Sequence, residues 1–516
     1  MNLTNDVFMP ASVYKRNPWR LKDNLILSGA GQNSVEGMLA MSHAMGDDKK
    51  PALVAVYEHI RGTAYEKNWV VREMPVMFPG AVLQIGFSLP GGNDAELQAI
   101  VRGEGDAALR EAARFYRNLQ LPILLRIGYE FDGPAWNNFR PETYIRAFHH
   151  IVNVLEEEGA LNVATVWDAT SVGDDITPDY YPGDNVVDWF GYNSIIPNYD
   201  RVNHMAHMAK SHNKPIMSGE AAYAFKVEDI CFKDWINGYF GGMRRDGVQA
   251  YQYINWEWAK SPLSKGWTSW ANSRFTEDPS RKEAYLNAMS GNDMVYRGLD
   301  YAQPVCLYID TTMGCYEGKT PEKWNKDCDL VCYTPGYDYS VEGVIPTHEE
   351  PFGANWRITG CGTLTFITPD DFFGEVAFYL PQNTDSFTLY VNDEAVYWDN
   401  SFGWLHIPIN KCGDVSLCIE RRDGELLHIK GIALVKKQAT LEAPKPVKDK
   451  HGLKWEPLPG ALHYRIFKNK QLMDITVENT YPLPENAEGS YSVEAVYLRD
   501  GASKNIIAVE EGTVMV

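Results

Sequence analysis

Apolar runs and amphipathic stretches alternate through the first 300 residues of the chain. The apolar runs are short and bounded by turn residues, as in strands that are buried on both faces. Eight strands are predicted, at residues 24–29, 52–57, 81–87, 122–127, 162–167, 186–192, 215–218 and 248–254. Helical spacing of apolar residues predicts helices between several of them, at 95–101, 107–118 and 141–158.

This alternation favours a parallel α/β fold, and eight such units match a (β/α)8 TIM barrel over residues 1–300. A doubly wound sheet that binds a dinucleotide is the alternative. Gly29 and Gly31 after the first strand favour it, but the third glycine of the dinucleotide fingerprint is missing. The barrel is therefore the preferred prediction.

The pattern changes after residue 300. Short alternating runs separated by turn residues predict an antiparallel β-sandwich of the jelly-roll type for residues 301–440. Its role is open between a carbohydrate-binding module and a structural support for the barrel. Trp356, Trp398 and Trp404 are its candidate stacking residues.

A Pro/Lys-rich linker at 441–450 opens a third predicted domain, residues 441–516. Its pairs Leu453/Trp455, Tyr464/Ile466 and Tyr491/Val493 resemble the pattern of a fibronectin type III domain. That resemblance implies a second all-β sandwich, with a spacer or packing role.

Polar and aromatic residues follow the predicted barrel strands, at the ends where barrel enzymes place their chemistry. The fourth strand ends in Arg126, Tyr129 and Glu130, and the seventh is followed by Glu220. Glycoside hydrolysis uses two such carboxyl groups, one protonated and one ionised. The other strand ends carry Trp167, Asp168, Tyr192, Asn193, Trp256, Glu257 and Trp258.

Residues ~20–275 resemble the clan A glycoside hydrolases, and most of all glycoside hydrolase family 26, the family of β-mannanases and related endo-glycanases. The resemblance rests on Arg126-x-x-Tyr129-Glu130 with Gly133 and Trp136 after it, and on the segments 181–184, 187–191 and 218–220. It implies a retaining mechanism in which Glu130 is the acid/base, Glu220 is the nucleophile, and Tyr192 steadies the nucleophile. This chain has Tyr129 where the family pattern has histidine.

The residue types agree with these roles. Arg126 can hold a carboxylate ionised, whereas Glu130 needs an apolar wall, such as Phe131 or Trp136, to keep its proton. Trp136 beside Asn137 suits a sugar, which presents hydroxyls and C–H faces.

The remaining strand-end residues leave alternatives open. Trp167, Trp256 and Trp258 are candidate sugar platforms, with core packing as the alternative. Asp168 is either a ligand of the sugar or a residue that orients others, and Tyr129 and Asn193 are expected to contact substrate. Glu257 is the rival carboxylate or a ligand of a sugar hydroxyl.

Composition narrows the partners. A net charge of −20 without a long basic run argues against nucleic acid, and no apolar run reaches the ~20 residues of a membrane span. Motifs for a metal or cofactor are absent, so none is expected.

No signal peptide is visible, so we expect a secreted or periplasmic protein if a leader was removed, and a cytoplasmic one otherwise. Seven of the eight cysteines lie between 306 and 418, where disulfides and free thiols are both open.

The leading interpretation is a retaining glycoside hydrolase that acts on a β-linked polysaccharide or oligosaccharide. A non-catalytic carbohydrate-binding protein on a degenerate barrel is the alternative from another class, and a nicotinamide-dependent enzyme is the third. The sugar, its linkage and the oligomeric state are left open.

Overall fold

A computed structural model describes much of the chain. The described residues are 21, 24–31, 35–46, 49–60, 78, 81–91, 93–119, 122–133, 136–170, 177–195, 203–224, 230–258, 272–297, 305–309, 331–333, 338–349, 353–368, 372, 374–384, 387–398, 401–409, 415–421, 426–429, 432–436, 443–458, 461–484, 486–497, 506–507 and 512–515. The chain divides into two compact units, residues 1–259 with 266–301 and residues 260–265 with 302–516.

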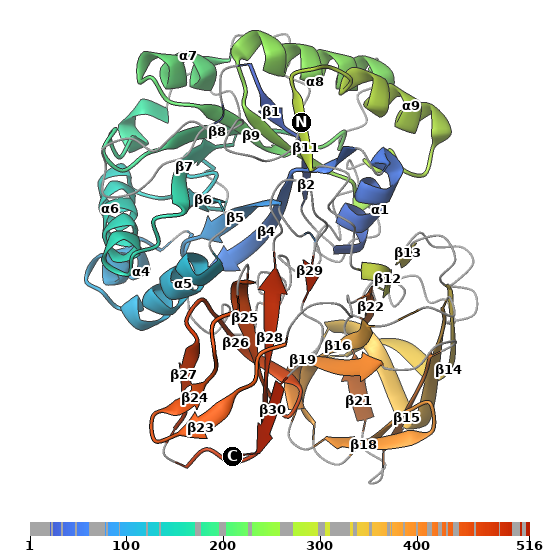
Figure 1. The fold of residues 1–516 in the computed structure, drawn as a ribbon. Helices are drawn as coiled ribbons and strands as arrows, with labels where there is room; N and C mark the ends of the chain where they lie inside the picture. Colours follow the sequence, from blue (N-terminus) through green and yellow to red (C-terminus); the bar gives the residue numbers. More distant parts are fainter. Residues whose placement is uncertain are drawn as a thin grey trace. The chain divides into compact units, whose positions relative to one another are not determined.

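Parallel strands close into a barrel in the first unit (Figure 1). The ring closes because β2, the first strand of the order, also pairs with β10, the eighth. The predicted barrel is thus confirmed, and all its strands except β2 start and end within three residues of their predicted limits. They are β2 (Gly29–Gly31), β4 (Leu53–His59), β5 (Val82–Ser88), β6 (Ile123–Ile127), β7 (Val163–Ala169), β8 (Trp189–Ser194), β9 (Ile216–Ala221) and β10 (Ala250–Ile254).

Three short strands extend this sheet. The predicted first strand is split into β1 (Ile26–Leu27) and β2, and β1 pairs with both β10 and β11 (Met294–Arg297). At the end of the order, β3 (Lys50–Pro51) pairs antiparallel with β11.

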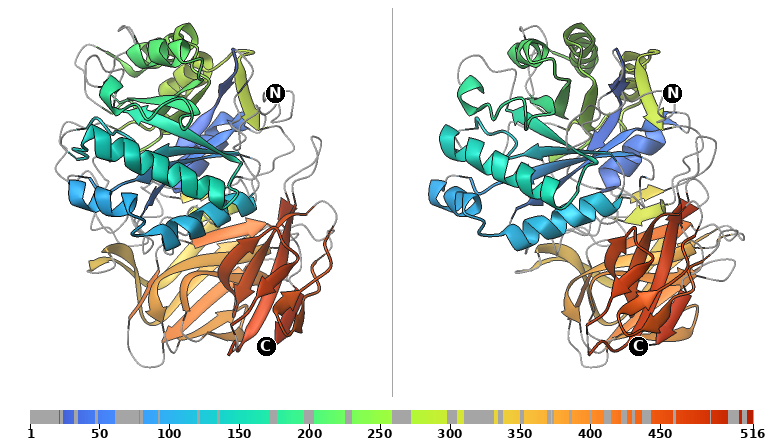
Figure 2. Two further views of the ribbon diagram at one scale, coloured as in Figure 1. Left: turned by 90° about the vertical axis from the view of Figure 1, so that its left-hand side faces the viewer. Right: turned by 60° about the vertical axis from the view of Figure 1, so that its left-hand side comes forward.

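Helices surround the barrel strands, as Figure 2 shows from two further sides. The three predicted helices are confirmed as α4 (Asp94–Val101), α5 (Asp106–Leu119) and α6 (Pro141–Glu157). Pro141 occupies the first turn of α6, where its missing N–H costs nothing. The other helical segments are α1 (Val35–Met45), η2 (Thr177–Tyr180), α7 (His204–Ser211), α8 (Phe232–Asp246) and α9 (Pro279–Ala288).

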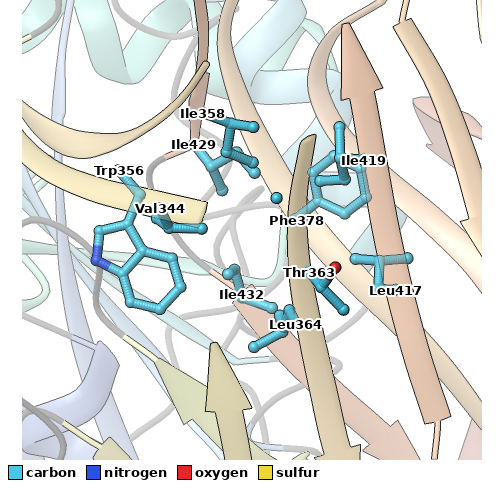
Figure 3. A pocket seen from close by; sticks show the side chains of 11 residues that line it. Val344, Trp356, Ile358, Thr363, Leu364, Phe378, Leu417, Ile419, Ile429 and Ile432 are labelled. Carbon is cyan, nitrogen blue, oxygen red and sulfur yellow. The ribbon is translucent and has the colours of Figure 1, made fainter. Parts of the chain in front are cut away.

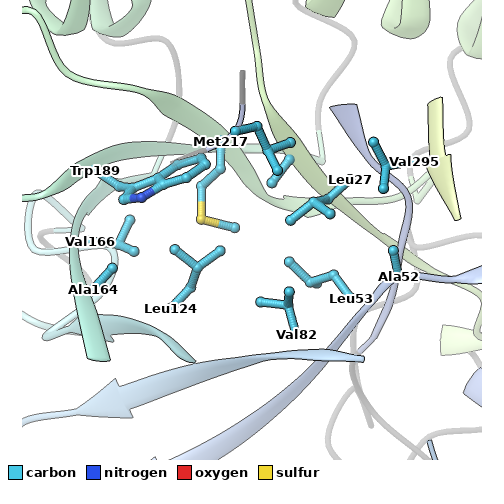
Figure 4. Close-up of a cluster of buried hydrophobic side chains, with 12 residues drawn as sticks. Leu27, Ala52, Leu53, Val82, Leu124, Ala164, Val166, Trp189, Met217 and Val295 are labelled. Carbon is cyan, nitrogen blue, oxygen red and sulfur yellow. The ribbon is translucent and has the colours of Figure 1, made fainter. Parts of the chain in front are cut away.

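A cluster of apolar side chains fills the barrel near the amino-terminal ends of its strands (Figure 4). Leu53, Val82 and Trp189 each come from the first residues of their strand, and all three are almost completely buried. This apolar cluster fills the amino-terminal half of the barrel, so polar groups can occupy the opposite, carboxyl-terminal ends of the strands.

The described strands of the second unit pair antiparallel and form three sheets. The all-β prediction for this region is confirmed. A ten-stranded sheet contains β12 (Val305–Ile309), β13 (Val331–Tyr333), β16 (Gly374–Thr384), β19 (Ser401–Ile409), β22 (Ile432–Lys436), β25 (Ala461–Lys468), β26 (Gln471–Thr476), β28 (Ser490–Tyr497), β29 (Ile506–Ile507) and β30 (Gly512–Met515). A six-stranded sheet contains β14 (Asp338–Glu349), β15 (Gly353–Ile367), β17 (Phe387–Val391), β18 (Glu394–Trp398), β20 (Val415–Arg421) and β21 (Leu426–Ile429), and a three-stranded sheet contains β23 (Val447–Asp449), β24 (Gly452–Lys454) and β27 (Thr480–Pro482).

The division of this unit at residue 441 stays a prediction. The larger sheet crosses it, because Leu405 of β19 pairs with Gln471 of β26. The residues of the fibronectin-like pattern, among them Trp455 and Tyr491, nevertheless pack into one apolar cluster of their own. The jelly-roll and fibronectin type III assignments likewise remain predictions.

A small apolar cavity lies inside the second unit (Figure 3). Its lining comes from both larger sheets, with Ile358 of β15 in one and Phe378 of β16 in the other. Trp356 also lines it and is 1% exposed, so the expectation of a surface stacking residue at this position is wrong. The side chains of Trp398 and Trp404 lie outside the described part of the chain.

None of the helices in the described ranges combines the length and the apolar character that crossing a bilayer requires.

Candidate active site

The two glutamates predicted from the strand ends share one hydrogen-bond network. Asn193 of β8 donates its amide to Glu130 at 2.6 Å. The amide oxygen of Asn193 accepts from Arg126 at 3.1 Å, and Arg126 in turn donates to Glu220 at 3.1 Å. Residues from β6, β8 and β9 therefore join the two carboxyl groups, although 90 positions separate them in the chain.

Glu220 faces this network because β9 contains a β-bulge. Along β8, Tyr192 pairs with Ser218 and the next residue, Asn193, pairs with Glu220, so Gly219 is an additional residue in β9. In a regular strand Ser218 and Glu220 would point to the same side. Ser218 lies beside Tyr192 and Tyr239 of α8, on the helix side of the sheet. The bulge turns Glu220 to the barrel interior instead.

The bulge requires glycine at position 219 because there is no space for a side chain there. A Cβ atom on Gly219 would lie 2.5 Å from Asp168 Oδ1 and 2.8 Å from Arg126 Nε. Gly191 of β8 has the same constraint, since its Cβ would lie 2.3 Å from Asp168 Oδ1. The two glycines leave room for the Asp168 carboxylate between β8 and β9.

Asp168 holds Arg126 in place. Its Oδ2 accepts from Arg126 Nε at 3.0 Å and from Nη2 at 2.5 Å, and neither side chain is exposed. The prediction of Asp168 as a sugar ligand is therefore wrong, and its alternative role as an orienting residue matches the structure. A fully buried carboxylate below the surface of the site cannot reach a bound sugar.

Burial and neighbouring charges set the pKa values of this pair. Burial raises the pKa of Asp168 to about 6, although Arg126 opposes the shift. Burial also disfavours the charge on Arg126, but Asp168 and Glu220 outweigh it and raise the pKa of Arg126 well above its usual value. Arg126 therefore stays charged between two carboxylates.

Glu130 is protonated at neutral pH. Its burial, and then the charge of Glu220, raise the pKa of Glu130 to about 8, against the opposing effects of Asn193 and Arg126. A carboxyl group in this state can donate a proton, which an ordinary surface glutamate cannot do at pH 7.

The turn after β6 aims Glu130 at the network through an unusual backbone. Glu130 has a φ of 54°, in the left-handed region that non-glycine residues rarely adopt. The backbone N–H of Glu130 donates to the Asp168 carbonyl at 2.8 Å. The Asn137 amide donates to the carbonyls of Tyr129 and Glu130 at 2.9 and 2.6 Å, so Asn137 fixes this turn rather than presenting a free amide to a sugar.

Tyr57 of β4 is a site residue that the sequence pattern did not single out. Its hydroxyl donates to Glu220 Oε1 at 2.6 Å. Burial and then the charge of Glu220 raise the pKa of Tyr57 well above its usual value, so it remains a donor. Its place at the end of a barrel strand is the signal that could have identified it.

Tyr192, predicted to steady the nucleophile, faces the other way. Strand alternation turns it outward because Asn193 next to it points inward. The groups around its hydroxyl include Ser218 and the α8 residues Arg245 and Asp246. The predicted role of Tyr192 is therefore wrong, and Glu220 accepts a hydrogen bond from the hydroxyl of Tyr57 instead.

Tyr129 forms part of the wall around the carboxyl groups. Its ring packs edge-on against Tyr57, with 5.4 Å between ring centroids, and the Arg126 guanidinium lies 4.8 Å from its centroid. The residue that replaces the histidine of the family pattern thus covers the central arginine.

Of the four tryptophans predicted to contact the sugar, Trp136 alone is exposed. Trp136 is 54% exposed, and its ring lies so close to Gly133 that a Cβ there would be 2.5 Å away. Trp167 is completely buried and stacks on Phe131, with centroids 4.8 Å apart.

The other two tryptophans are buried as well. Trp256 and Trp258 are 5% and 4% exposed, and Trp258 donates to Ser273 at 3.1 Å. Trp167, Trp256 and Trp258 are therefore core residues in this structure, and the prediction that they form platforms is wrong.

Glu257, the rival carboxylate, is ion-paired with Arg274, which also pairs with Glu277. Within the ranges that the structure describes, no three His, Cys, Asp or Glu side chains are grouped to hold a metal ion.

A comparison with known protein families finds a match to the part of the chain that contains the two glutamates. Residues 98–238 match the family model of Glycosyl hydrolase family 26, a segment that contains both Glu130 and Glu220. The resemblance to family 26 is thereby confirmed for this segment.

Two curated relatives are β-1,3-xylanases. The chain is 28% identical to β-1,3-xylanase TXYA of a Vibrio species over 312 residues, which are 52% of this chain and 65% of the relative. It is 28% identical to a β-1,3-xylanase of an Alcaligenes species over 269 residues, 45% of this chain and 55% of the relative. The chain thus spans less than two thirds of either relative's length. Among solved structures, the Bacillus subtilis mannanase BCman aligns with a TM-score of 0.42 and 16% identity, covering 55% of this chain and 89% of that chain.

Proposed function

We propose that the chain is a retaining glycoside hydrolase that cleaves a β-linked polysaccharide or oligosaccharide. The observation that carries the proposal is the network in which Asn193 and Arg126 join a protonated Glu130 to Glu220. The family match over residues 98–238 supports it.

Each glutamate has the contacts that its proposed role requires. Glu130, with a pKa of about 8, carries a proton for the oxygen of the leaving sugar. Glu220 accepts hydrogen bonds from Arg126 and Tyr57, which suit a carboxylate that attacks the anomeric carbon. The attack breaks the glycosidic bond and forms a covalent glycosyl ester with Glu220.

The same geometry supplies the base of the second step. The charge of Glu220 is one of the two leading causes that raise the pKa of Glu130. Ester formation removes that charge, so the pKa of Glu130 falls and the carboxylate becomes the stable form. Glu130 then takes a proton from the water that hydrolyses the ester, and Glu220 is released as a carboxylate.

The relatives suggest which substrate to test first. Both curated proteins are named β-1,3-xylanases, so β-1,3-xylan comes first, followed by β-mannan and mixed-linkage β-glucan. Trp136 is the exposed aromatic ring beside the Glu130 turn and is the proposed platform for a sugar face.

The test compares product release by the wild type, Glu220→Ala and Glu130→Ala on these polysaccharides. We expect Glu220→Ala to be inactive and to regain turnover with azide, which gives a glycosyl azide of inverted configuration. Glu130→Ala should lose roughly 10²–10⁴-fold in rate on natural substrates. Glu157→Ala on the outer surface of α6 is the matched control, and it should keep wild-type activity.

Cleavage that survives in Glu220→Ala would overturn the site assignment. Saturable binding of a polysaccharide without any hydrolysis would instead support the carbohydrate-binding alternative.

A further inference from the structure

Two cysteine thiols lie against each other in the second unit. The Sγ atoms of Cys361 in β15 and Cys418 in β20 are 3.2 Å apart, although 57 positions separate the residues in the chain. Both cysteines are free thiols in this structure.

Strand pairing fixes this approach. In the antiparallel ladder Cys361 pairs with Glu420 and Thr363 pairs with Cys418, so the cysteines are diagonal neighbours on one face of the sheet. The opposite face is apolar, since Leu364 and Leu417, which pair with each other, are buried. The hydrogen-bonded pairing of β15 with β20 therefore keeps the two thiols close to each other, and no loop is needed for it.

We propose that Cys361 and Cys418 form a reversible disulfide that links β15 to β20. The bond length of about 2.05 Å requires the sulfur atoms to approach by roughly 1 Å from their positions here. Cys361 is exposed and Cys418 half-buried, so reductants and oxidants in solution reach the pair.

Oxidised glutathione is a sufficient co-reactant. The Cys361 thiolate attacks its disulfide, forms a mixed disulfide and releases one glutathione thiolate. The Cys418 thiolate then attacks the Cys361 sulfur of the mixed disulfide and releases the second glutathione. Two cysteine thiols are oxidised, one oxidised glutathione is reduced to two thiols, and the two protons pass to the released glutathiones.

Exposure sets the order of these steps. Cys361 is the accessible thiol, whereas burial raises the pKa of Cys418 and reduces its thiolate fraction. Glutathione should therefore be found on Cys361 when the second step is blocked.

The experiment uses the reduced full-length chain, equilibrated with oxidised and reduced glutathione at several ratios. Free thiols are then alkylated in denaturant, and the chain is digested and mapped by mass spectrometry without reduction. We expect a cross-linked peptide that contains Cys361 and Cys418. Reduction should abolish this peptide and make both thiols available for alkylation. In Cys418→Ser, the same treatment should leave glutathione on Cys361.

Cys231→Ser is the matched control, because Cys231 is another exposed free thiol and lies in the first unit. It should leave the cross-linked peptide unchanged. Alkylation of both Cys361 and Cys418 at every glutathione ratio would overturn the proposal, as would a cross-link from either one to a different cysteine.

Discussion

The hydroxyl of Tyr57 donates a 2.6 Å hydrogen bond to Glu220, across 163 positions of sequence. This contact connects the ends of β4 and β9. It places a neutral donor beside the proposed nucleophile in addition to the charged donor Arg126.

Tyr57→Phe should therefore lower kcat by about 10–100-fold, because a hydrogen bond to a charged group contributes about 1.5–3 kcal/mol. The ring that packs against Tyr129 is retained, so folding should be unaffected. Tyr192→Phe is the control, since its hydroxyl faces the helix layer, and steady-state kinetics of both variants checks the prediction. A larger loss in Tyr192→Phe would reverse the assignment.

The pH dependence of kcat/KM should be bell-shaped. Activity should fall as pH rises through about 8, where Glu130 loses its proton. It should also fall as pH decreases through about 6, where Asp168 is protonated and its hold on Arg126 weakens. The groups interact, so both limbs are properties of the cluster. Rates across the pH range test this. The acid limb should move in Asp168→Asn, and an unchanged limb would contradict its assignment.

The free energy of unfolding should depend on pH through the carboxyl group of Glu130. The pKa of Glu130 in the folded state, about 8, lies above its ordinary value of 4.5, so the folded chain binds this proton more tightly than the unfolded chain. The stabilisation is complete below the ordinary value and is lost as pH rises through about 8. Glu130→Gln should therefore lose less stability than the wild type between pH 6 and 9 in thermal unfolding. Parallel curves for the two proteins would disagree with this expectation.

Gly219→Ala should damage both folding and activity. The added methyl group meets Asp168 and Arg126 at less than 3 Å, and such overpacking costs about 1–3 kcal/mol. Gly241→Ala is the matched control. Gly241 lies on α8, and a Cβ atom added there would meet nothing within 4 Å outside its own helix, so alanine should stabilise the chain by up to about 1 kcal/mol. Denaturant unfolding of both variants measures the difference, and equal effects would rule out the steric explanation.

Trp136→Ala should raise KM by about 2–10-fold while kcat changes little. Its exposed ring can contribute about 0.5–1.5 kcal/mol to binding but lies outside the network of the two glutamates. Trp136→Phe should restore most of the affinity. A fall in kcat with unchanged KM would instead point to a role in shaping the Glu130 turn.

The sequence predicted the parts of this structure that depend on local pattern. Bounded apolar runs located the barrel strands, and the rule that barrel chemistry lies at strand ends located Arg126, Glu130, Asn193 and Glu220. The family resemblance identified the same glutamates.

What the sequence could not supply depends on packing. Whether Trp167 is a platform or a core residue is decided by Phe131, which stacks on it from another part of the chain. The inward direction of Glu220 depends on the bulge at Gly219, and a strand pattern alone would have turned that side chain to the helices. Tyr57 and Tyr192 both lie near the carboxyl ends of their strands. Which of them points into the barrel depends on how the strands pair, and a strand pattern in the sequence does not show that.

The left-handed backbone of Glu130 has a consequence for directed evolution. A φ of 54° in a non-glycine residue costs about 1–3 kcal/mol, and glycine or asparagine adopts it more easily than glutamate does. A library screened only for heat resistance should therefore enrich Glu130→Gly or Glu130→Asn. Such variants would be more heat-stable but would lack the proposed acid/base and be inactive. Selection on this barrel therefore has to require hydrolytic activity as well as stability.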